Sequence, residues 1–167
     1  MKIYRASFDI TTKIITFIVF SLIFWEILAT ALQGAWQVGI PISIAFSLFI
    51  IGTYAYSIKA YQILDESLLI KRAFSKFDKA IPLAEIESVS IPNEADFKYT
   101  VRTFGNGGLF GYYGLYANKT LGSFRMYATN KANRILIILK DGKGKIVLSP
   151  DDTGMVDDLR KHLKKQA

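Results

Sequence analysis

Two long apolar runs near the N-terminus dominate the hydrophobic pattern of the chain. Residues 14–33 form twenty mostly apolar positions, and residues 40–58 form nineteen positions without a charged side chain. About 20 apolar residues in a helix span the hydrocarbon core of a bilayer. Each run is therefore predicted to be a transmembrane helix. The segment between them, residues 34–39, contains two glycines and Trp36 and is predicted to be the loop of a helical hairpin.

Basic residues lie before and after the predicted hairpin, and none lies in the loop at residues 34–39. They are Lys2, Arg5 and Lys13 before the first run and Lys59, Lys71 and Arg72 after the second. The positive-inside rule predicts from this pattern that both termini face the cytoplasm. The alternative is a cleaved signal peptide, since residues 29–31 (Ala-Thr-Ala) resemble a cleavage pattern, but Glu26 and the second apolar run argue against it. We expect a multi-pass protein of the inner (cytoplasmic) membrane.

Glu26 is the only ionisable residue inside the two apolar runs. A carboxylate in the hydrocarbon core costs a few kcal/mol unless it is protonated or hydrogen-bonded. Thr30 lies on the same face of the first predicted helix, and Ser43 and Ser47 share a face of the second. If the hairpin turns at the middle of its loop, Glu26 faces Ser47 and Thr30 faces Ser43. These residues are predicted either to hold the helices together or to form an intramembrane site for a proton or a partner.

After residue 59 the pattern changes to short apolar or alternating runs, which are typical of β-strands. Seven strands are predicted, at residues 60–64, 67–74, 77–81, 86–91, 121–128, 134–139 and 145–148. Residues 141–144 (Asp-Gly-Lys-Gly) are typical of a tight turn, which predicts that the last two strands are antiparallel neighbours. Val156, Leu159 and Leu163 then recur at helical spacing and predict a closing amphipathic α-helix.

The predicted elements divide the chain into two parts. Residues 1–59 form the transmembrane hairpin, and residues 60–167 form one cytoplasmic domain, because about 110 residues suffice for a single small domain. Seven antiparallel strands followed by one helix is the order of a pleckstrin-homology-like (PH-like) β-barrel or sandwich, in which the helix covers one open end. The expected fold class is therefore α+β, with a helical membrane hairpin followed by a PH-like domain that the C-terminal helix caps.

Three segments of the second part resemble a known family. Residues 102–116 (RTFGNGGLFGYYGLY) and 121–130 (LGSFRMYATN) are similar to the signature of bacterial membrane-anchored PH-domain proteins, and residues 81–89 (IPLAEIESV) also fit that family. The resemblance covers roughly residues 60–163, and two preceding membrane spans match a common arrangement in such proteins. It implies a PH-like fold and a membrane location. It implies no particular activity, since many of these bacterial proteins have no assigned biochemistry.

Glycines alternate with aromatic residues in segment 104–116, between the fourth and fifth predicted strands, and we expect this segment to be a flexible loop. Its candidate binding residues are Phe104, Gly105, Gly107, Gly108, Phe110, Gly111, Tyr112, Tyr113, Gly114 and Tyr116. The spacing fits neither a dinucleotide fingerprint, since Phe110 stands at a required glycine, nor a P-loop. Two interpretations stay open. The rings cover an open mouth of the barrel, or exposed rings of Phe110, Tyr112 and Tyr113 enter the head-group layer or bind a partner.

The net charge of +7 favours a location beside anionic lipid head groups. Within the predicted domain, a candidate basic face consists of Lys71, Arg72, Lys76 and Lys79. It is either a solvated strand face or a surface that contacts lipid. The turn at residues 65–66 is Asp-Glu, which would repel the phosphates that eukaryotic PH domains usually bind at their first hairpin. We therefore do not expect a phosphoinositide site at this turn.

The residue types needed for most catalytic or metal sites are scarce. The chain has no cysteine, and its single histidine, His162, lies among lysines of the final predicted helix. The sequence shows no acid pair, nucleophile motif or metal-spaced cluster, and no motif for nucleic-acid binding. We therefore expect no enzymatic activity, no metal site, no cofactor and no nucleic-acid partner.

These features together predict a non-enzymatic, membrane-anchored PH-like interaction or scaffold module at the cytoplasmic membrane face. It would act through residues 104–116, with membrane lipids and a membrane or cytoplasmic protein as partners. One alternative is a lipid sensor that uses the basic face and the aromatic segment, and another is an accessory subunit that uses Glu26 or Arg125. Self-association of the hairpin into a homo-oligomer through glycine and serine residues of the second run is also left open.

Overall fold

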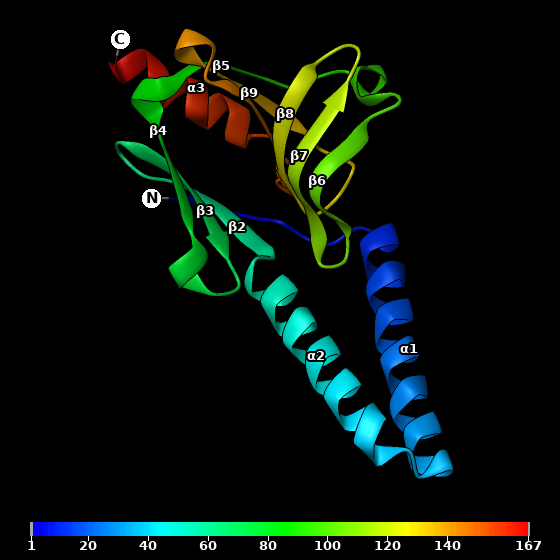
Figure 1. The fold of residues 1–167 in the computed structure, drawn as a ribbon. Coiled ribbons are helices and arrows are strands. Elements are labelled where there is room, and N and C mark those ends of the chain that lie inside the picture. Colours follow the sequence, from blue (N-terminus) through cyan, green and yellow to red (C-terminus); the bar gives the residue numbers. More distant parts are fainter. Residues whose placement is uncertain (1, 167) are drawn as a thin grey trace.

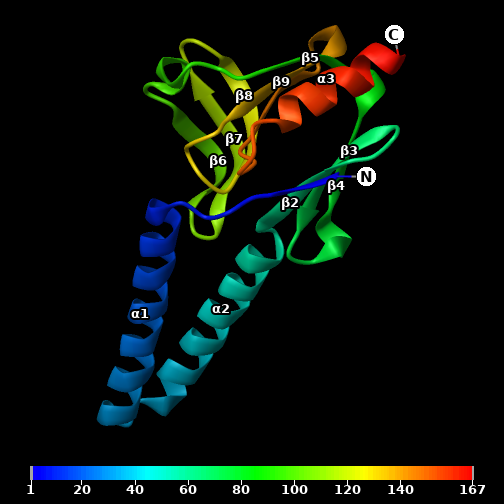
Figure 2. The ribbon, with the colours of Figure 1, turned by 180° about the vertical axis from the view of Figure 1, so that it is seen from behind.

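Two long helices project from a β-rich domain in the computed structural model, which describes residues 2–166 of the chain and the side chains of residues 2–164 (Figure 1). Helix α1 spans Ile10–Gln33 and helix α2 spans Trp36–Ala55, and both are long and apolar enough to cross a membrane. They lie close together near the turn that joins them and separate toward the domain (Figures 1 and 2). Many large apolar side chains on both helices are exposed, so the helices associate the protein with a membrane.

The turn between the helices is shorter than the predicted loop at residues 34–39. Gly34 ends α1 in the left-handed conformation (φ 66°), and its N–H donates to the Thr30 carbonyl. Helix α2 begins only two residues later, at Trp36. The interfacial tryptophan therefore opens the second helix instead of lying in the middle of a loop.

The second membrane helix passes directly into the first sheet. Helix α2 ends at Ala55, whereas the prediction continued the apolar span to residue 58. The Ser57 carbonyl accepts a hydrogen bond from the Ala73 N–H at 2.8 Å, and Ile58 is fully buried at the start of a strand. The predicted span is too long at this end because hydropathy does not distinguish an isoleucine that faces lipid from one that faces a protein core.

Within residues 2–166, ten strands form two sheets. The first sheet is antiparallel, with the order β1-β2-β3-β4 and the bounds Lys2–Arg5, Ile58–Ile63, Ser67–Arg72 and Lys79–Pro82. The second has the order β5-β9-β10-β8-β7-β6, and its strands in chain order are β5 Ile86–Ser90, β6 Val101–Gly108, β7 Gly111–Asn118, β8 Gly122–Ala128, β9 Ile135–Leu139 and β10 Gly144–Leu148. The chain closes with α3 (Met155–Gln166), and its short 3-10 helices are η1 Ser75–Phe77, η2 Leu83–Glu85, η3 Glu94–Phe97 and η4 Lys140–Gly142.

All seven predicted strands are present, as β2 to β5 and β8 to β10. The predicted turn joins β9 to β10, where Asp141 (φ 56°) and Gly142 (φ 65°) adopt the left-handed conformation of a tight hairpin. One neighbouring pair, β8 and β10, is parallel rather than antiparallel. The elements form the expected α+β, PH-like fold, and over the described residues the two sheets do not close into a barrel.

Three strands go beyond the prediction. Strand β1 lies before α1, in the part assigned to the membrane hairpin, yet it pairs with β2 along its whole length. Its sequence, Lys-Ile-Tyr-Arg, suggested only a basic flank of the first span. Strands β6 and β7 form an antiparallel hairpin over the segment that was expected to be a flexible loop, so that expectation is wrong. The physical reason is the close pairing that its glycines permit, described below.

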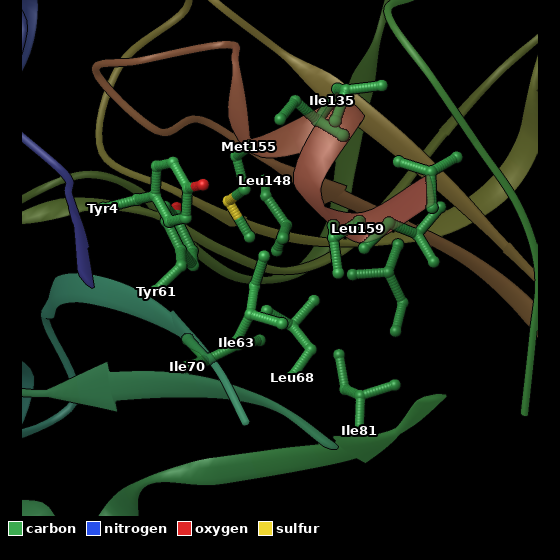
Figure 3. Close-up of a cluster of buried hydrophobic side chains, with 14 of the residues drawn as sticks. Tyr4, Tyr61, Ile63, Leu68, Ile70, Ile81, Ile135, Leu148, Met155 and Leu159 are labelled. Atoms are coloured by element: carbon green, nitrogen blue, oxygen red, sulfur yellow. The ribbon is translucent and has the colours of Figure 1, made fainter. Parts of the chain in front are cut away.

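The main core lies between the first sheet, one face of the second sheet and α3 (Figure 3). Tyr61 is fully buried there, and its hydroxyl donates to the Tyr127 carbonyl at 2.6 Å and accepts from the Ser149 N–H at 3.1 Å. Alternate residues of β9 and β10, such as Leu136 and Val147, point to the other face of the second sheet and join a smaller core. The second sheet is thus covered on both faces.

Candidate functional site

The tip of the β6-β7 hairpin lies between the domain ends of α1 and α2 (Figures 1 and 2). The Phe110 ring makes edge-to-face contacts with Tyr54 of α2 and Phe20 of α1, with ring centroids 5.3 and 6.3 Å apart. The Phe110 N–H donates to the hydroxyl of Thr16 in α1 at 3.4 Å. Phe110 of the glycine-aromatic segment thus packs the β-rich domain against both membrane helices.

Two further residues complete this contact. Gly108 has φ 132°, a conformation that favours glycine, and β6 lies so close to α1 here that a Cβ atom would be 2.4 Å from Cδ1 of Ile15. The Tyr113 hydroxyl donates to the Thr53 carbonyl of α2 at 2.9 Å. Phe110 itself has φ 56°, which is uncommon for a residue with a side chain, and its ring contacts offset that strain. We call Gly108, Phe110 and Tyr113 the wedge.

Of the two interpretations left open for this segment, the one with exposed rings of Phe110, Tyr112 and Tyr113 is wrong. Phe110 is 7% exposed, Tyr112 is 5% exposed and Tyr113 is half-buried. Their rings pack against this chain's own helices and sheet, which removes them from the surface. The alternative of rings that cover a barrel mouth does not describe Phe110 either, because its ring lies between two helices. Phe104 has the exposed ring of this segment, and its exposed fraction is 74%.

Glycines also bring β6 and β7 close together. Gly105 and Gly114 lie directly opposite each other, with φ 108° and 130°. A Cβ atom on either one would lie 2.3 or 2.2 Å from a carbonyl oxygen of the other strand. On the face of the hairpin that bears Tyr112 and Tyr116, Gly107 pairs with Tyr112 and has no side chain, which leaves open space beside the rings.

That space is part of a cavity of about 430 Å³, which we call the basic pocket. Its cations are Arg102, Lys131 and Arg134, and its walls include Phe97, Tyr112 and Tyr116. No carboxylate of the described residues lines it. The basic pocket lies on the face of the second sheet that points away from the main core, beside the smaller core.

The aromatic walls of the basic pocket hold two of its cations. The Arg134 guanidinium lies 4.0 Å from the centre of the Phe97 ring, and the Lys131 ammonium lies 5.3 Å from that of Tyr112. Burial lowers the pKa of Arg134, which still remains protonated at neutral pH. Burial raises the pKa of Tyr116 to about 12, so this phenol is neutral. The pocket therefore presents positive charge over uncharged rings.

Inside the membrane hairpin, Glu26 is hydrogen-bonded by hydroxyl groups of both helices. The Ser43 hydroxyl of α2 donates to the carboxylate at 2.7 Å, and the Thr30 hydroxyl of α1 donates at 3.3 Å. The prediction that Ser47 faces Glu26 is wrong, because Ser43 bonds to Glu26 and Ser47, one turn nearer the domain on the same face of α2, is exposed. The contacts fit a structural role for Glu26, and a proton or partner site there stays a prediction.

The register of the two helices differs from the predicted one by one helical turn. Thr30 faces Gly39 rather than Ser43, and a Cβ atom at Gly39 would lie 2.1 Å from the Thr30 side chain. The chain reverses at residues 34–35 rather than at the middle of residues 34–39. Shortening the loop by one helical turn moves every facing pair along α2 by the same amount.

A comparison with known protein families identifies the domain. The family model described as Bacterial PH domain matches residues 59–165, which is more than half of the chain. The chain belongs to the bacterial PH domain family. The match begins in β2 and ends in α3, so it leaves out β1 and both membrane helices. Neither a curated protein nor a solved structure matched the chain.

The candidate basic face of the PH domain is not one uniform surface. Lys76 and Lys79 are exposed, and Lys71 is half-exposed. Arg72 instead packs against Tyr56. Its Nη1 donates to the Tyr56 carbonyl at 2.9 Å, and its guanidinium lies 5.1 Å from the centre of the Tyr56 ring. Burial lowers the pKa of Arg72. Arg72 therefore supports the junction of α2 with the domain, and lipid contact by the three lysines stays a prediction.

The remaining candidates in the PH domain lie apart from one another. His162 contacts the Asp158 carbonyl within α3 at 2.9 Å, and Arg125 is exposed on β8. In the part of the chain that the structure describes, no group of three or more His, Cys, Asp or Glu side chains is placed to hold a metal ion. None of these residues approaches the basic pocket or the wedge closely enough to line it.

Sequence reasoning missed the basic pocket of the PH domain. Lys131 and Arg134 belong to the connection between β8 and β9, far along the chain from Arg102 in β6. One signal was available: two paired strands in the glycine-aromatic segment place Arg102 and Tyr116 opposite each other on one face. Because this segment was interpreted as a flexible loop, its strand pairing was not predicted. The contribution of Lys131 and Arg134 depends on the tertiary fold alone.

Proposed function

We propose that this chain is a non-enzymatic, membrane-anchored PH module that binds a protein partner through the outer surface of its β6-β7 hairpin. The observation that supports this most is an apolar patch of Val101, Phe104 and Leu115, which are 64%, 74% and 43% exposed. The strand register puts all three side chains on one face. Strand β6 is also an edge of its sheet, and an open edge can accept a further strand from a partner.

The position of the apolar patch suits a partner that itself lies in the membrane. The wedge fixes one end of the β6-β7 hairpin to α1 and α2, which keeps the patch at a constant height above the bilayer. A groove of about 480 Å³ between β6 and α2 is lined by residues that include Leu48, Phe49 and Tyr113. It continues from the hairpin to the lipid-facing surface of α2. A partner with a membrane helix and a short cytoplasmic segment would contact both surfaces.

The orientation that we propose has both termini in the cytoplasm, in a multi-pass protein of the inner membrane. Strand β1 precedes α1 and strand β2 follows α2, and the two strands pair with each other. The chain therefore enters and leaves the hairpin on the same side. The lysines and arginines on that side favour the cytoplasm by the positive-inside rule.

Photocrosslinking in intact membranes tests the proposed function. A photoreactive amino acid replaces Phe104 or Leu115, and the matched control replaces Glu87, which is exposed on β5 at the opposite edge of the same sheet. We expect a discrete protein adduct at both patch positions and none at the control. Adducts with lipid alone would favour the lipid-sensor alternative, and an adduct with a second copy of this chain would identify a homo-oligomer. Equal protein labelling at Glu87 would contradict the proposal.

A further inference from the structure

Three cations converge on the basic pocket without a carboxylate partner. Among residues 2–164, Arg102, Lys131 and Arg134 form no salt bridge. The Nε of Arg134 donates to the Lys131 carbonyl at 2.6 Å, and within the same residues both Nη groups of Arg134 remain free of hydrogen bonds. Cations gathered in a partly buried cavity repel each other, and an anion placed between them relieves that repulsion.

The carboxylates nearest to the basic pocket do not neutralise it. Asp9 caps the start of α1, and its oxygens accept from the Thr12 N–H at 2.7 Å, the Lys131 N–H at 3.2 Å and the Tyr112 hydroxyl at 3.2 Å. The charge of Asp9 is thus already stabilised by three donors. Glu94 raises the pKa of Arg134 through space, against the larger opposing effect of burial, but it is not within salt-bridge distance.

The contacts with α1 place the basic pocket at the height of the lipid head groups. Asp9, beside the pocket, precedes Ile14 by five residues, which corresponds to about 7 Å along a helix. Ile14 begins the apolar span, and the head-group layer extends roughly 5–7 Å beyond the hydrocarbon core. At the lower end of the pocket, Gly107 directly precedes Gly108, which contacts Ile15. If the apolar span begins at Ile14, the head group of a lipid in the adjacent leaflet lies close to the pocket.

The shape of the basic pocket suits a phosphate. Arg102 extends along β6 toward the membrane, and a Cβ atom at Gly107 would lie 3.0 Å from its Nη1. The Arg134 guanidinium lies over the Phe97 ring, 4.0 Å from its centre. Guanidinium groups recognise phosphate through paired N–H donors, and a volume of about 430 Å³ is within the usual range of ligand pockets.

We propose that the basic pocket binds the phosphate of an anionic membrane lipid, with Arg102 and Arg134 contacting the phosphate and Lys131 at the rim. A soluble phosphate ester offers the same chemistry, and the height of the pocket favours the lipid. The site goes beyond the proposed protein-binding function. It lies on the opposite face of the β6-β7 hairpin from the apolar patch. Arg102 also lines the groove between β6 and α2, whereas Lys131 and Arg134 do not, so changes at Lys131 and Arg134 separate the lipid site from the protein-binding surface.

Native mass spectrometry of the full-length protein in detergent tests this site, with phosphatidylglycerol and phosphatidylcholine as the probes. The variant Arg102→Gln/Lys131→Gln/Arg134→Gln removes the three cations. The control Lys71→Gln/Lys76→Gln/Lys79→Gln removes the same charge from the first sheet and η1. We expect wild type to retain phosphatidylglycerol in preference to phosphatidylcholine. The pocket variant should bind it about 100-fold more weakly, and the control should change little, since each nearby cation contributes about fivefold.

Three results would overturn the lipid site. One is equal retention of the two lipids by wild type. Another is an equal loss in the pocket variant and the control, which would indicate a diffuse attraction to negative charge. The third is displacement of phosphatidylglycerol by millimolar glycerol 3-phosphate, which would assign the basic pocket to a soluble phosphate ester instead.

A single charge reversal keeps the test valid if the triple variant folds poorly. Lys131 is exposed, and among the side chains of residues 2–164 its ammonium contacts the Tyr112 ring alone. Lys131→Glu is expected to weaken phosphatidylglycerol binding about 30-fold with an unchanged unfolding temperature, because it removes one positive charge and adds one negative charge. The matched control is Lys119→Glu, an exposed reversal in the turn between β7 and β8. Equal losses in the two variants would contradict a defined site.

Discussion

The two ends of the α1-α2 hairpin are held in different ways. Near the turn, Gly39 and Ser43 of α2 contact Thr30 and Glu26 of α1 directly, so small side chains and hydrogen bonds bring the helices together. Near the domain, the helices separate and the wedge fills the gap, with the Phe110 ring in contact with both. One end is closed by the hairpin itself, and the other is held open by the PH domain.

This difference separates local from long-range folding. Ser43 and Glu26 are 17 residues apart, so their contact can form when the hairpin enters the membrane. Phe110 and Thr16 are 94 residues apart, so their contact requires a folded β6-β7 hairpin. The separation of the helices at the domain end therefore depends on the folded state of the PH domain. A substitution at one end of the hairpin should therefore alter the packing at the other end, because α1 and α2 connect the two.

Phe110→Ala is expected to have the largest effect, because it removes the ring that contacts both helices near the domain. Removing a buried aromatic ring leaves a cavity, and we expect a loss of about 3 kcal/mol in the free energy of unfolding. Circular dichroism of the full-length protein during denaturation in detergent measures it. The control is Phe104→Ala, an exposed ring of the same hairpin, for which we expect a change of less than about 0.5 kcal/mol. Similar values for both variants would show that the wedge does not hold the helices.

Gly39→Ala tests the closed end of the hairpin. The new methyl group would lie 2.1 Å from Cγ2 of Thr30, so the helices must move apart, at a cost of about 2 kcal/mol. Gly52→Ala is the matched control in the same helix, since nothing lies within 4 Å of a Cβ there. Unfolding of the two variants by sodium dodecyl sulfate in micelles compares them. If Gly39→Ala were as stable as Gly52→Ala, the helices would not pack in this register.

Two serine variants test the register between α1 and α2 further. Ser43→Ala removes a hydrogen bond to Glu26 inside the membrane, which is worth about 0.6 kcal/mol on average. Ser47→Ala, one turn along the same helix, should have little effect because Ser47 is exposed and does not reach Glu26. The same micelle unfolding assay measures both variants. The opposite order of the two effects would favour the register predicted from the middle of the loop.

The smallest expected effect concerns β1, which ties the start of α1 to the PH domain. Hydrogen bonds from Tyr4 and Lys2 lower the pKa of Asp158 in α3. A lowered pKa in the folded state means that this carboxylate stabilises the fold above about pH 4 and loses that contribution as the pH falls through the folded pKa. Asp158→Asn should therefore be less stable than wild type at pH 7, and the difference should shrink as the pH falls below about 4. A difference that does not change between pH 7 and the acid range would contradict this origin.

Part of the candidate site follows from the sequence. The alternation of glycine with aromatic residues in segment 104–116 indicated an unusual surface, and Glu26 with Thr30 and Ser43 indicated polar contacts between the helices. The sequence did not indicate that Phe110 would be buried, since an aromatic ring beside glycines is equally compatible with a loop at the surface. That outcome depends on α1 and α2, which present Phe20 and Tyr54 to it.

Other errors have a common physical origin. The one-turn error in the hairpin register arose because nothing in residues 34–39 shows whether Trp36 lies in the loop or opens α2. Strand β1 was missed because four alternating residues carry little pattern of their own and are stabilised by pairing with β2, more than fifty residues away. The basic pocket was missed because Lys131 and Arg134 join Arg102 only through the order of strands in the second sheet.

The amino-acid sequence by itself determined which segments are long and apolar enough to cross a membrane, where most strands occur and to which family the PH domain belongs, because hydropathy, periodicity and turn residues act over short stretches of chain. Only the tertiary structure decided which faces meet: Phe110 against both membrane helices, Ser43 rather than Ser47 against Glu26, and three separated cations around one cavity. These outcomes depend on close packing between distant segments, where a shift of one turn or one strand changes every partner.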